Sequence, residues 1–228
     1  MSTTPVLLLL GAGARVGQSV TKAFAAKGYK IALISRTQKS EEDTPEKLHL
    51  AADLSNPGSV AEVFTQVSSK LGTPSVVVYN AAGLTIASET DPLSLGLAEF
   101  TRDLHINTTS AFSAAQQAVV AFSKLPDSAS RTFIYTGNIL NTGVVSSLYL
   151  DLGVGKSATA NFIHVAAETY KEKGFKFYYA DERKADGSSG GKDIDGDAHA
   201  ELYIELAEGK TQGPWQQTFV KGKGYIKF

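Results

Sequence analysis

The chain of 228 residues contains no cysteine, so it has no disulfide, no zinc–thiolate site and no thiol nucleophile. It also lacks an excess of charge of either sign. Its 22 Lys and Arg residues stand against 23 Asp and Glu residues, which gives a formal net charge of −1. This balance provides no general attraction to nucleic acid or to anionic membranes, and we expect neither as a partner.

Long hydrophobic runs are absent as well. The longest, Val6 to Leu10, is far shorter than the roughly 20 residues that a membrane-spanning helix needs. Met1 to Pro5 carries no basic region typical of a signal peptide. Because 43% of the residues are hydrophobic, the chain is also not of the disordered class. We therefore expect a single globular domain over residues 1–228, located in the cytoplasm, whose partner is a small-molecule substrate.

Short apolar runs alternate along the chain with segments of helical periodicity. The run Val6 to Leu10 is apolar at every position, which is typical of a strand buried on both faces of a parallel sheet. The pattern predicts an α/β fold, a doubly wound parallel sheet of the Rossmann type with about seven strands and helices on both faces. Further strands are predicted at 31–34, 49–52, 75–79, 132–135, 175–179 and within 215–228, and helices at 16–27, 60–71, 95–104, 108–122, 153–173 and 198–208.

One stretch of low complexity, Asp181 to Asp197, is rich in Gly, Ser, Asp and Lys and is predicted to be a mobile surface loop. Its position after the sixth strand leaves open a role as a substrate lid. Asp193, Asp195 and Asp197 superficially suggest calcium ligands, but the nearby glycine and glutamate do not fall at EF-hand spacing. We expect no metal site.

Three glycines, Gly11, Gly13 and Gly17, lie where the first strand turns into the first helix. Glycine lets the backbone approach a phosphate closely, and a helix N-terminus offers free N–H groups and a partial positive charge. The spacing differs from the commoner Gly-x-Gly-x-x-Gly and would also suit a tight strand–helix connection. Its place after the first strand of an alternating chain predicts a dinucleotide-binding turn.

The end of the second strand indicates which dinucleotide is bound. An NAD site usually has a carboxylate here for the adenosine ribose, whereas this chain has Ser35 and Arg36. A guanidinium can pair with the 2′-phosphate of NADP, and Arg15 could add a second contact. The alternative is that both arginines are ordinary surface residues. We predict that NADP(H) is preferred over NAD(H).

Taken in order, these and further motifs resemble the short-chain dehydrogenases/reductases, from about Val6 to Tyr179. Leu10 to Gly17 matches the family's Thr-Gly-x-x-x-Gly-x-Gly, except that Leu10 replaces the threonine and Arg15 the middle glycine. The resemblance implies that Asp53 borders the adenine, that Asn80 to Gly83 is the Asn-Asn-Ala-Gly motif, and that the protein is a homodimer or homotetramer. The candidate cofactor contacts are then Gly11, Gly13, Arg15, Val16, Gly17, Arg36, Asp53, Leu54, Asn80, Ala81, Ala82, Gly83 and Lys156.

The catalytic motif departs from the family. Asn107 matches the asparagine that supports a water-mediated proton relay, and Lys156 matches the lysine of Tyr-x-x-x-Lys, which also binds the nicotinamide ribose. Leu152 stands at the tyrosine position, four residues before the lysine. Leucine cannot exchange a proton with a substrate, so the catalytic set is degenerate. The family's serine is also replaced, and Asn138 or Thr136 would have to polarise a substrate carbonyl.

Two residues could substitute for the tyrosine. Tyr149 lies seven residues before Lys156, about two helical turns, and would share its face if the helix began that early. Otherwise it is a packing residue. Asp151 could act as an acid or base if desolvated, but it also suits an N-cap or a first-turn acid.

The predicted function is that of an NADP(H)-dependent oxidoreductase acting on a small carbonyl, an alcohol or an activated double bond. Because one fold hosts many functions, two alternatives stay open. One is a non-redox enzyme, such as an isomerase or cyclase, on the same scaffold. The other is a catalytically silent nucleotide-binding protein.

Overall fold

The computed structural model describes residues 4–228 of the chain, so the start of the Met1 to Pro5 segment lies outside the described residues. Its centre is an eight-stranded sheet with the strand order β3-β2-β1-β4-β5-β6-β7-β8, one strand more than predicted. All neighbouring strands are parallel except β7 and β8. The strands are β1 (Val6–Leu10), β2 (Lys30–Ser35), β3 (Lys47–Ala51), β4 (Val76–Tyr79), β5 (Thr132–Thr136), β6 (Lys176–Glu182), β7 (Gln216–Val220) and β8 (Gly224–Tyr225).

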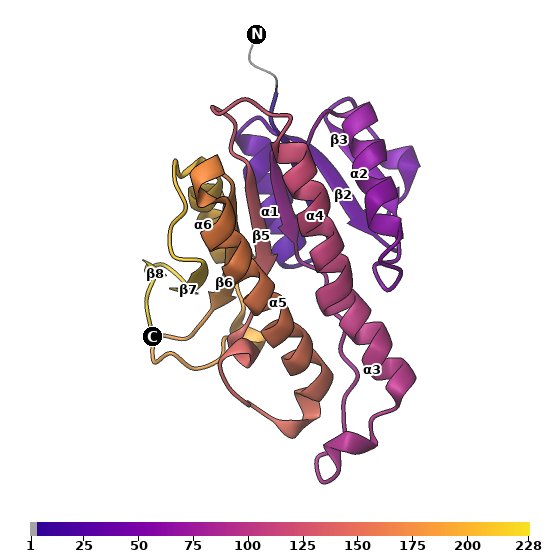
Figure 1. Cartoon of the computed structure of the whole chain (residues 1–228), viewed down its shortest axis with the longest axis vertical. Coiled ribbons are helices and arrows are strands. Elements are labelled where there is room, and N and C mark those ends of the chain that lie inside the picture. Colours follow the sequence, from indigo (N-terminus) through magenta and orange to yellow (C-terminus); the bar gives the residue numbers. More distant parts are fainter. Residues whose placement is uncertain (1–3) are drawn as a thin grey trace.

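Helices cover both faces of this sheet, as the alternating pattern predicts. Figure 1 shows α4 and α5 in front of the strands and α1 behind them. Each face has its own buried apolar cluster, one under α2, α4 and α5 and the other under α1 and α6. The helices are α1 (Val16–Ala26), α2 (Ser59–Lys70), α3 (Leu97–Leu104), α4 (Ser110–Phe122), α5 (Leu150–Tyr170) and α6 (Gly196–Glu208).

Two element boundaries differ from the sequence prediction in ways that matter for the site. Helix α5 begins at Leu150, before the predicted Gly153. Strand β6 continues through Asp181 and Glu182, which the sequence analysis assigned to the loop 181–197. Both acids are buried in the sheet, and Arg183 after them is buried too. Because this segment is polar, the sequence pattern does not reveal that its first two residues belong to a strand.

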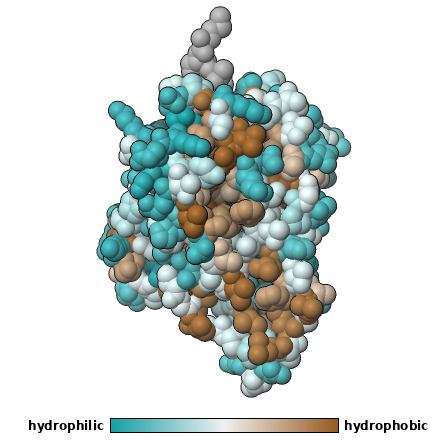
Figure 2. Space-filling view, viewed as in Figure 1, coloured by the Kyte–Doolittle hydropathy of each residue, from teal (hydrophilic) through white to brown (hydrophobic). Residues whose placement is uncertain are grey.

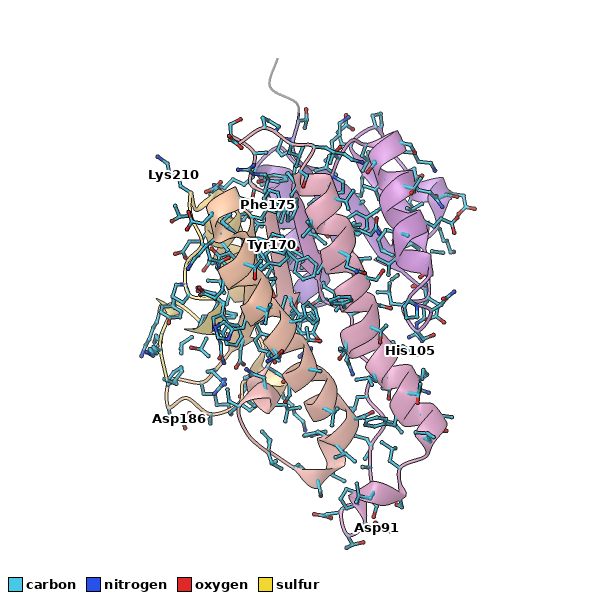
Figure 3. All side chains as sticks on the ribbon, in the orientation of Figure 1. Asp91, His105, Tyr170, Phe175, Asp186 and Lys210 are labelled. Carbon is cyan, nitrogen blue, oxygen red and sulfur yellow. The ribbon has the colours of Figure 1, made fainter. Side chains whose placement is uncertain are left out.

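Stacked tyrosines line the α5 side of the central strands. The rings of Tyr79 and Tyr135 lie 5.7 Å apart, and those of Tyr135 and Tyr179 lie 5.6 Å apart. Further along the same face, Tyr170 at the end of α5 stacks on Phe175 at 6.1 Å (Figure 3). This aromatic layer fixes α5, which carries Lys156, against the sheet.

A π-helical turn, His105–Thr109, joins α3 to α4 and so brings Asn107 inward (Figure 3 labels His105 at this junction). A π-turn inserts an extra residue into a helix and is often found at functional positions. No helix in the described part of the chain is both long and apolar enough to cross a membrane.

Candidate functional site

The glycine turn lies at the carboxyl end of β1, and its three glycines differ in what surrounds them. Gly11 has a φ of +95°, and a Cβ there would lie 2.4 Å from the backbone nitrogen of Ala81. A Cβ on Gly17 would come within 3.0 Å of Ala12. A Cβ on Gly13 would meet nothing within 4 Å. Packing thus explains Gly11 and Gly17. At Gly13 the space beside the backbone is open to a ligand such as a pyrophosphate, while its own N–H donates to the carbonyl of Gly11 at 2.8 Å.

Beside this turn, the ends of β2 and β3 bring a cation and an acid together. Arg36 and Asp53 are both exposed. Asp53 accepts a hydrogen bond from the backbone N–H of Ser55 at 2.9 Å. This bond and the Ser55 side chain lower the pKa of Asp53, and the charge of Arg36 adds to the effect. The two predicted cofactor residues therefore share one exposed corner, where the adenosine end of a dinucleotide would lie.

The predicted Asn80 to Gly83 motif follows β4 and is fixed by two sets of hydrogen bonds. The side chain of Asn80 donates to the carbonyl of Gly11 at 2.8 Å, which ties the motif to the glycine turn. Asn107 accepts from the N–H of Gly83 at 3.0 Å and donates to its carbonyl at 2.8 Å. Of the other predicted contacts, Val16 and Leu54 are buried, Ala81 is half-buried, and Arg15 and Ala82 are exposed.

The carbonyl of Asn107 is already occupied on both lone pairs. It accepts from the hydroxyl of Tyr135 at 2.9 Å and from that of Thr159 at 2.8 Å. A carbonyl oxygen has two lone pairs, so a relay water at this atom would have to displace one hydroxyl. No sequence motif marks Tyr135 as a site residue, because it is one of several aromatic residues in the predicted strands.

Lys156 is buried at the centre of the site. Its Nζ donates to the carbonyl of Thr136 at 2.8 Å and lies 4.4 Å from the centre of the Tyr135 ring. Burial lowers the pKa of Lys156 to about 7, although the charge of Asp181 opposes this. Its side chain therefore lies at the carboxyl end of β5.

Both proposed substitutes for the tyrosine lie at the start of α5. Tyr149 is half-buried and is the N-cap residue of this helix, with backbone angles of φ −106° and ψ 31°. Asp151 is the first-turn acid of α5, and its Oδ1 accepts from the N–H of Leu152 at 2.6 Å. Neither geometry supplies a proton donor at the position that Leu152 occupies.

Asp151 instead forms part of a buried acid pair with Asp103 of α3. Thr85 bridges the two, because its N–H donates to Asp151 at 2.8 Å and its hydroxyl donates to Asp103 at 2.6 Å. Burial, together with the hydrogen bond and charge of Asp103, raises the pKa of Asp151. Burial also pushes up the pKa of Asp103, but hydrogen bonds from Thr85, Asp151 and Arg102 outweigh it and lower that pKa. We call Thr85, Asp103 and Asp151 the acid clasp.

The candidates for polarising a carbonyl lie just after β5. The Oδ1 of Asn138 accepts from the N–H of Leu140 at 3.0 Å. The hydroxyl of Tyr179 accepts from the backbone N–H of Asn138 and donates to its carbonyl. No protein group in residues 4–228 accepts from its Nδ2, which leaves that amide as a donor. The hydroxyl of Thr136 pairs with that of Tyr203 at 2.8 Å, on the α6 side. Asn138 is thus better placed than Thr136 for this role.

Comparison with known proteins finds a family model and a relative that cover most of the chain. The family model described as enoyl-(acyl carrier protein) reductase matches residues 11–179. The short chain dehydrogenase/reductase dmxR12 of Cryptosporiopsis sp. (strain 8999) is 48% identical to this chain over 99% of its length and 96% of the relative.

Solved structures show the same fold at lower identity. A metagenomic short-chain oxidoreductase in complex with NADP superposes with a TM-score of 0.79 at 16% identity, over 96% of this chain and 99% of the other. An oxidoreductase from Brucella ovis, of the short chain dehydrogenase/reductase family and with a partially ordered NAD, gives a TM-score of 0.69 at 19% identity, over 90% and 93%.

Proposed function

Because this chain belongs to the short-chain dehydrogenase/reductase family, we propose that it is an NADP(H)-dependent oxidoreductase. Its substrate is a small carbonyl compound, an alcohol or an activated double bond. The open backbone at Gly13 is the observation that carries the proposal, because a pyrophosphate can approach there at the N-terminus of α1. The remaining cofactor residues follow β2, β3 and β4 at the same edge of the sheet.

The preference for NADP(H) rests on Arg36. Its exposed guanidinium stands next to Asp53 at the adenosine corner, where it can form charge-assisted hydrogen bonds with a 2′-phosphate. No acid follows β2 directly to accept a hydrogen bond from an unmodified ribose. A negatively charged 2′-phosphate would therefore be attracted at this corner, and a plain ribose would gain little from it.

The chain's own residues orient the reacting groups. The nicotinamide, when bound, supplies or accepts the hydride, and the protein sets the geometry and the proton transfer. In this proposal Lys156 donates to the ribose hydroxyls, and Asn138 Nδ2 donates to a substrate oxygen. Holding the carbonyl carbon near the hydride donor provides most of the rate, since proximity alone is worth several kcal/mol, roughly 7–11 in favourable cases.

The rim around the site favours a substrate with an apolar body. Figure 2 shows hydrophobic residues gathered at the lower end of the molecule, over α3 and the loops beside it. The loops after β4 and β5 are joined there, because the N–H of Ala87 donates to the carbonyl of Leu148 at 3.0 Å. The exposed apolar residues of these segments are Leu84, Ile86, Leu93, Leu97, Val144 and Val145.

The proposal is tested by following NADPH consumption with a panel of apolar aldehydes, ketones and activated alkenes. We expect turnover of at least one compound, lost in Lys156→Met. The protein should remain folded, as a circular dichroism melt would show. If no compound of the panel consumes NADPH, the oxidoreductase proposal is wrong.

Leu152 also fits a non-redox enzyme, and the same assay tests this alternative. A leucine at the tyrosine position removes the acid that carbonyl reduction ordinarily uses and puts an apolar side chain in its place. A non-redox isomerase or cyclase would use the site for its shape and electrostatics. Product formation with no change in NADPH absorbance would support it.

A further inference from the structure

Strand β6 carries charged residues into the interior on the side of α5. Successive side chains of a strand point to opposite faces. Tyr179 packs in the cluster under α5, and Tyr178 and Ala180 pack in the cluster under α6. Asp181 therefore points to the same side as Tyr179, towards the helix that carries Lys156. Its side chain is fully buried, with 0% exposure.

The carboxylate of Asp181 is only half satisfied. Its Oδ2 accepts from Nε of Arg183 at 2.6 Å. Arg183 is itself buried and is held in place by the carbonyl of Gly187, at 3.0 Å. In the described chain, Oδ1 of Asp181 has no hydrogen-bond partner. An unpaired buried carboxylate oxygen is costly and calls for an explanation in the working protein.

Lys156 reaches the same place from the other side. Thr136, whose carbonyl accepts from Nζ, pairs in register with Ala180, the residue before Asp181. Only one of the three N–H groups of the ammonium has a protein acceptor within residues 4–228. The charge of Asp181 raises the pKa of Lys156, against burial, while burial raises that of Asp181 to about 6.

Few other charges act on this pair. On β6, Arg183 lowers the pKa of Asp181, and Tyr179 lies beside it. On β5, the Tyr135 ring lies under the ammonium. On β7, the neighbour of Asp181 is the uncharged Thr218. In the described chain no ion pair within 4 Å joins Lys156 to Asp181, so the carboxylate acts on the ammonium through its charge and without direct contact.

We propose that Asp181 is a positioning residue for Lys156: its buried carboxylate opposes loss of the ammonium proton, so that Lys156 itself delivers the proton that the family's tyrosine would deliver. This inference rests on the proposed oxidoreductase function and names how its missing acid is replaced. Arg183 holds the carboxylate in place, and Leu152 leaves the space between Lys156 and the substrate free of a phenol.

Reduction of a carbonyl to an alcohol needs one hydride and one proton. The carbonyl carbon gains a hydride from the reduced nicotinamide, and a C–H bond forms. The π electron pair moves to the oxygen, which takes a proton from Nζ as an N–H bond breaks and an O–H bond forms. The carbonyl is reduced to an alcohol, the nicotinamide is oxidised, and the neutral amine regains a proton from water. Burial eases the loss of that proton, whereas the charge of Asp181 opposes its loss before substrate binds.

The first test needs neither cofactor nor substrate. We would titrate the protein by NMR with ¹³C-labelled lysine and aspartate, assigning Lys156 and Asp181 from the variants. Asp181→Asn should move the Lys156 midpoint down by about one pH unit, and Lys156→Met should move the Asp181 midpoint up by the same amount. The second variant leaves the Asp181–Arg183 pair intact, so it keeps the test decisive if Asp181→Asn does not fold.

Glu182→Gln is the matched control. It also removes a buried carboxylate from β6, but Glu182 faces α6, where it accepts from the N–H of Asp195 at 2.7 Å and lies 3.3 Å from His199. It should leave the Lys156 midpoint unchanged. An unchanged midpoint in Asp181→Asn, or unchanged titration of Asp181 in Lys156→Met, overturns the inference.

A second readout separates this inference from the proposed function. With any substrate that the panel identifies, the fall of kcat/KM at high pH should move to lower pH in Asp181→Asn and return towards wild type in Asp181→Glu. A purely structural role would lower the rate without moving the profile, and that result overturns the inference. If the NMR coupling is found but no substrate is reduced, the positioning of Lys156 stands and the oxidoreductase proposal fails.

Discussion

Leu152 is the residue that we propose stands in place of the family's tyrosine, and it gives the first prediction. It lies four residues before Lys156 on α5, so a phenol at 152 would share the helical face of the lysine. Leu152→Tyr should raise carbonyl reduction by about tenfold or more, because a positioned general acid typically contributes about 10²–10⁴.

The matched control is Leu152→Phe, which adds the same ring without a hydroxyl. Steady-state rates at saturating NADPH would compare the two variants with wild type. Equal rates for the tyrosine and phenylalanine variants would show that residue 152 does not stand where a donor can reach the substrate.

Arg36 gives the second prediction at this scale. Arg36→Ala should weaken NADPH binding by about 1–3 kcal/mol, because it removes a charge-assisted contact to the 2′-phosphate, and should leave NADH binding nearly unaffected. Lys39→Ala removes another exposed cation from the same loop and serves as the control. Calorimetric titration measures all four affinities. An equal loss for NADPH and NADH would contradict the assignment.

Single residues of the site could be predicted from sequence where a motif marks them. The glycines, Asn80, Asn107 and Lys156 fall at recognisable positions, and the structure brings them to one edge of the sheet. Asp181 could not be found in this way. Charged residues are rarely buried, so a run such as Asp181 to Arg183 suggests a solvated loop until the neighbouring strands are known.

The acid clasp links three elements, namely α3, α5 and the loop after β4, and gives a prediction at the element scale. Because the folded pKa of Asp151 is raised, its contribution to stability is present below the unfolded pKa of about 4 and is lost as pH rises through the folded pKa. Asp151→Asn cannot ionise. Its stability relative to wild type should therefore increase between pH 4 and pH 7.

Asp103→Asn is the control, because its effect on stability should depend on pH in the opposite direction. The folded pKa of Asp103 is lowered, so its contribution is present above the unfolded pKa, and removing it should cost stability at pH 7. Urea unfolding of each variant at a series of pH values measures both effects. Parallel pH curves for wild type and Asp151→Asn would show that the two carboxyls are not coupled.

The elements themselves were predictable where burial and periodicity agree. Val6 to Leu10 is apolar throughout and is a strand with both faces covered. The start of α5 was placed too late, because Gly153 and Gly155 lie in its first two turns and glycine has poor helix propensity. Gly155 is needed there, since a Cβ would lie 2.5 Å from that of Asn107. Tertiary packing thus overrides local propensity at the site.

At the scale of the whole molecule, the parallel sheet places every cofactor candidate at one edge, because parallel strands end on the same side. The exposed apolar side chains of α4 and α5, among them Phe112, Val120 and Val165, lie on the outer surface of the two helices. The homodimer or homotetramer that the family resemblance implies would bury them.

Every other part of the proposed function depends on binding of the dinucleotide. The purified protein would be titrated by calorimetry with NADPH and with NADH, alongside Gly13→Val, which fills the open space at this position of the turn. We expect saturable binding at one site, tighter for NADPH by about tenfold or more, and loss of both in the variant. Absence of binding by either cofactor to the folded wild-type protein would contradict it.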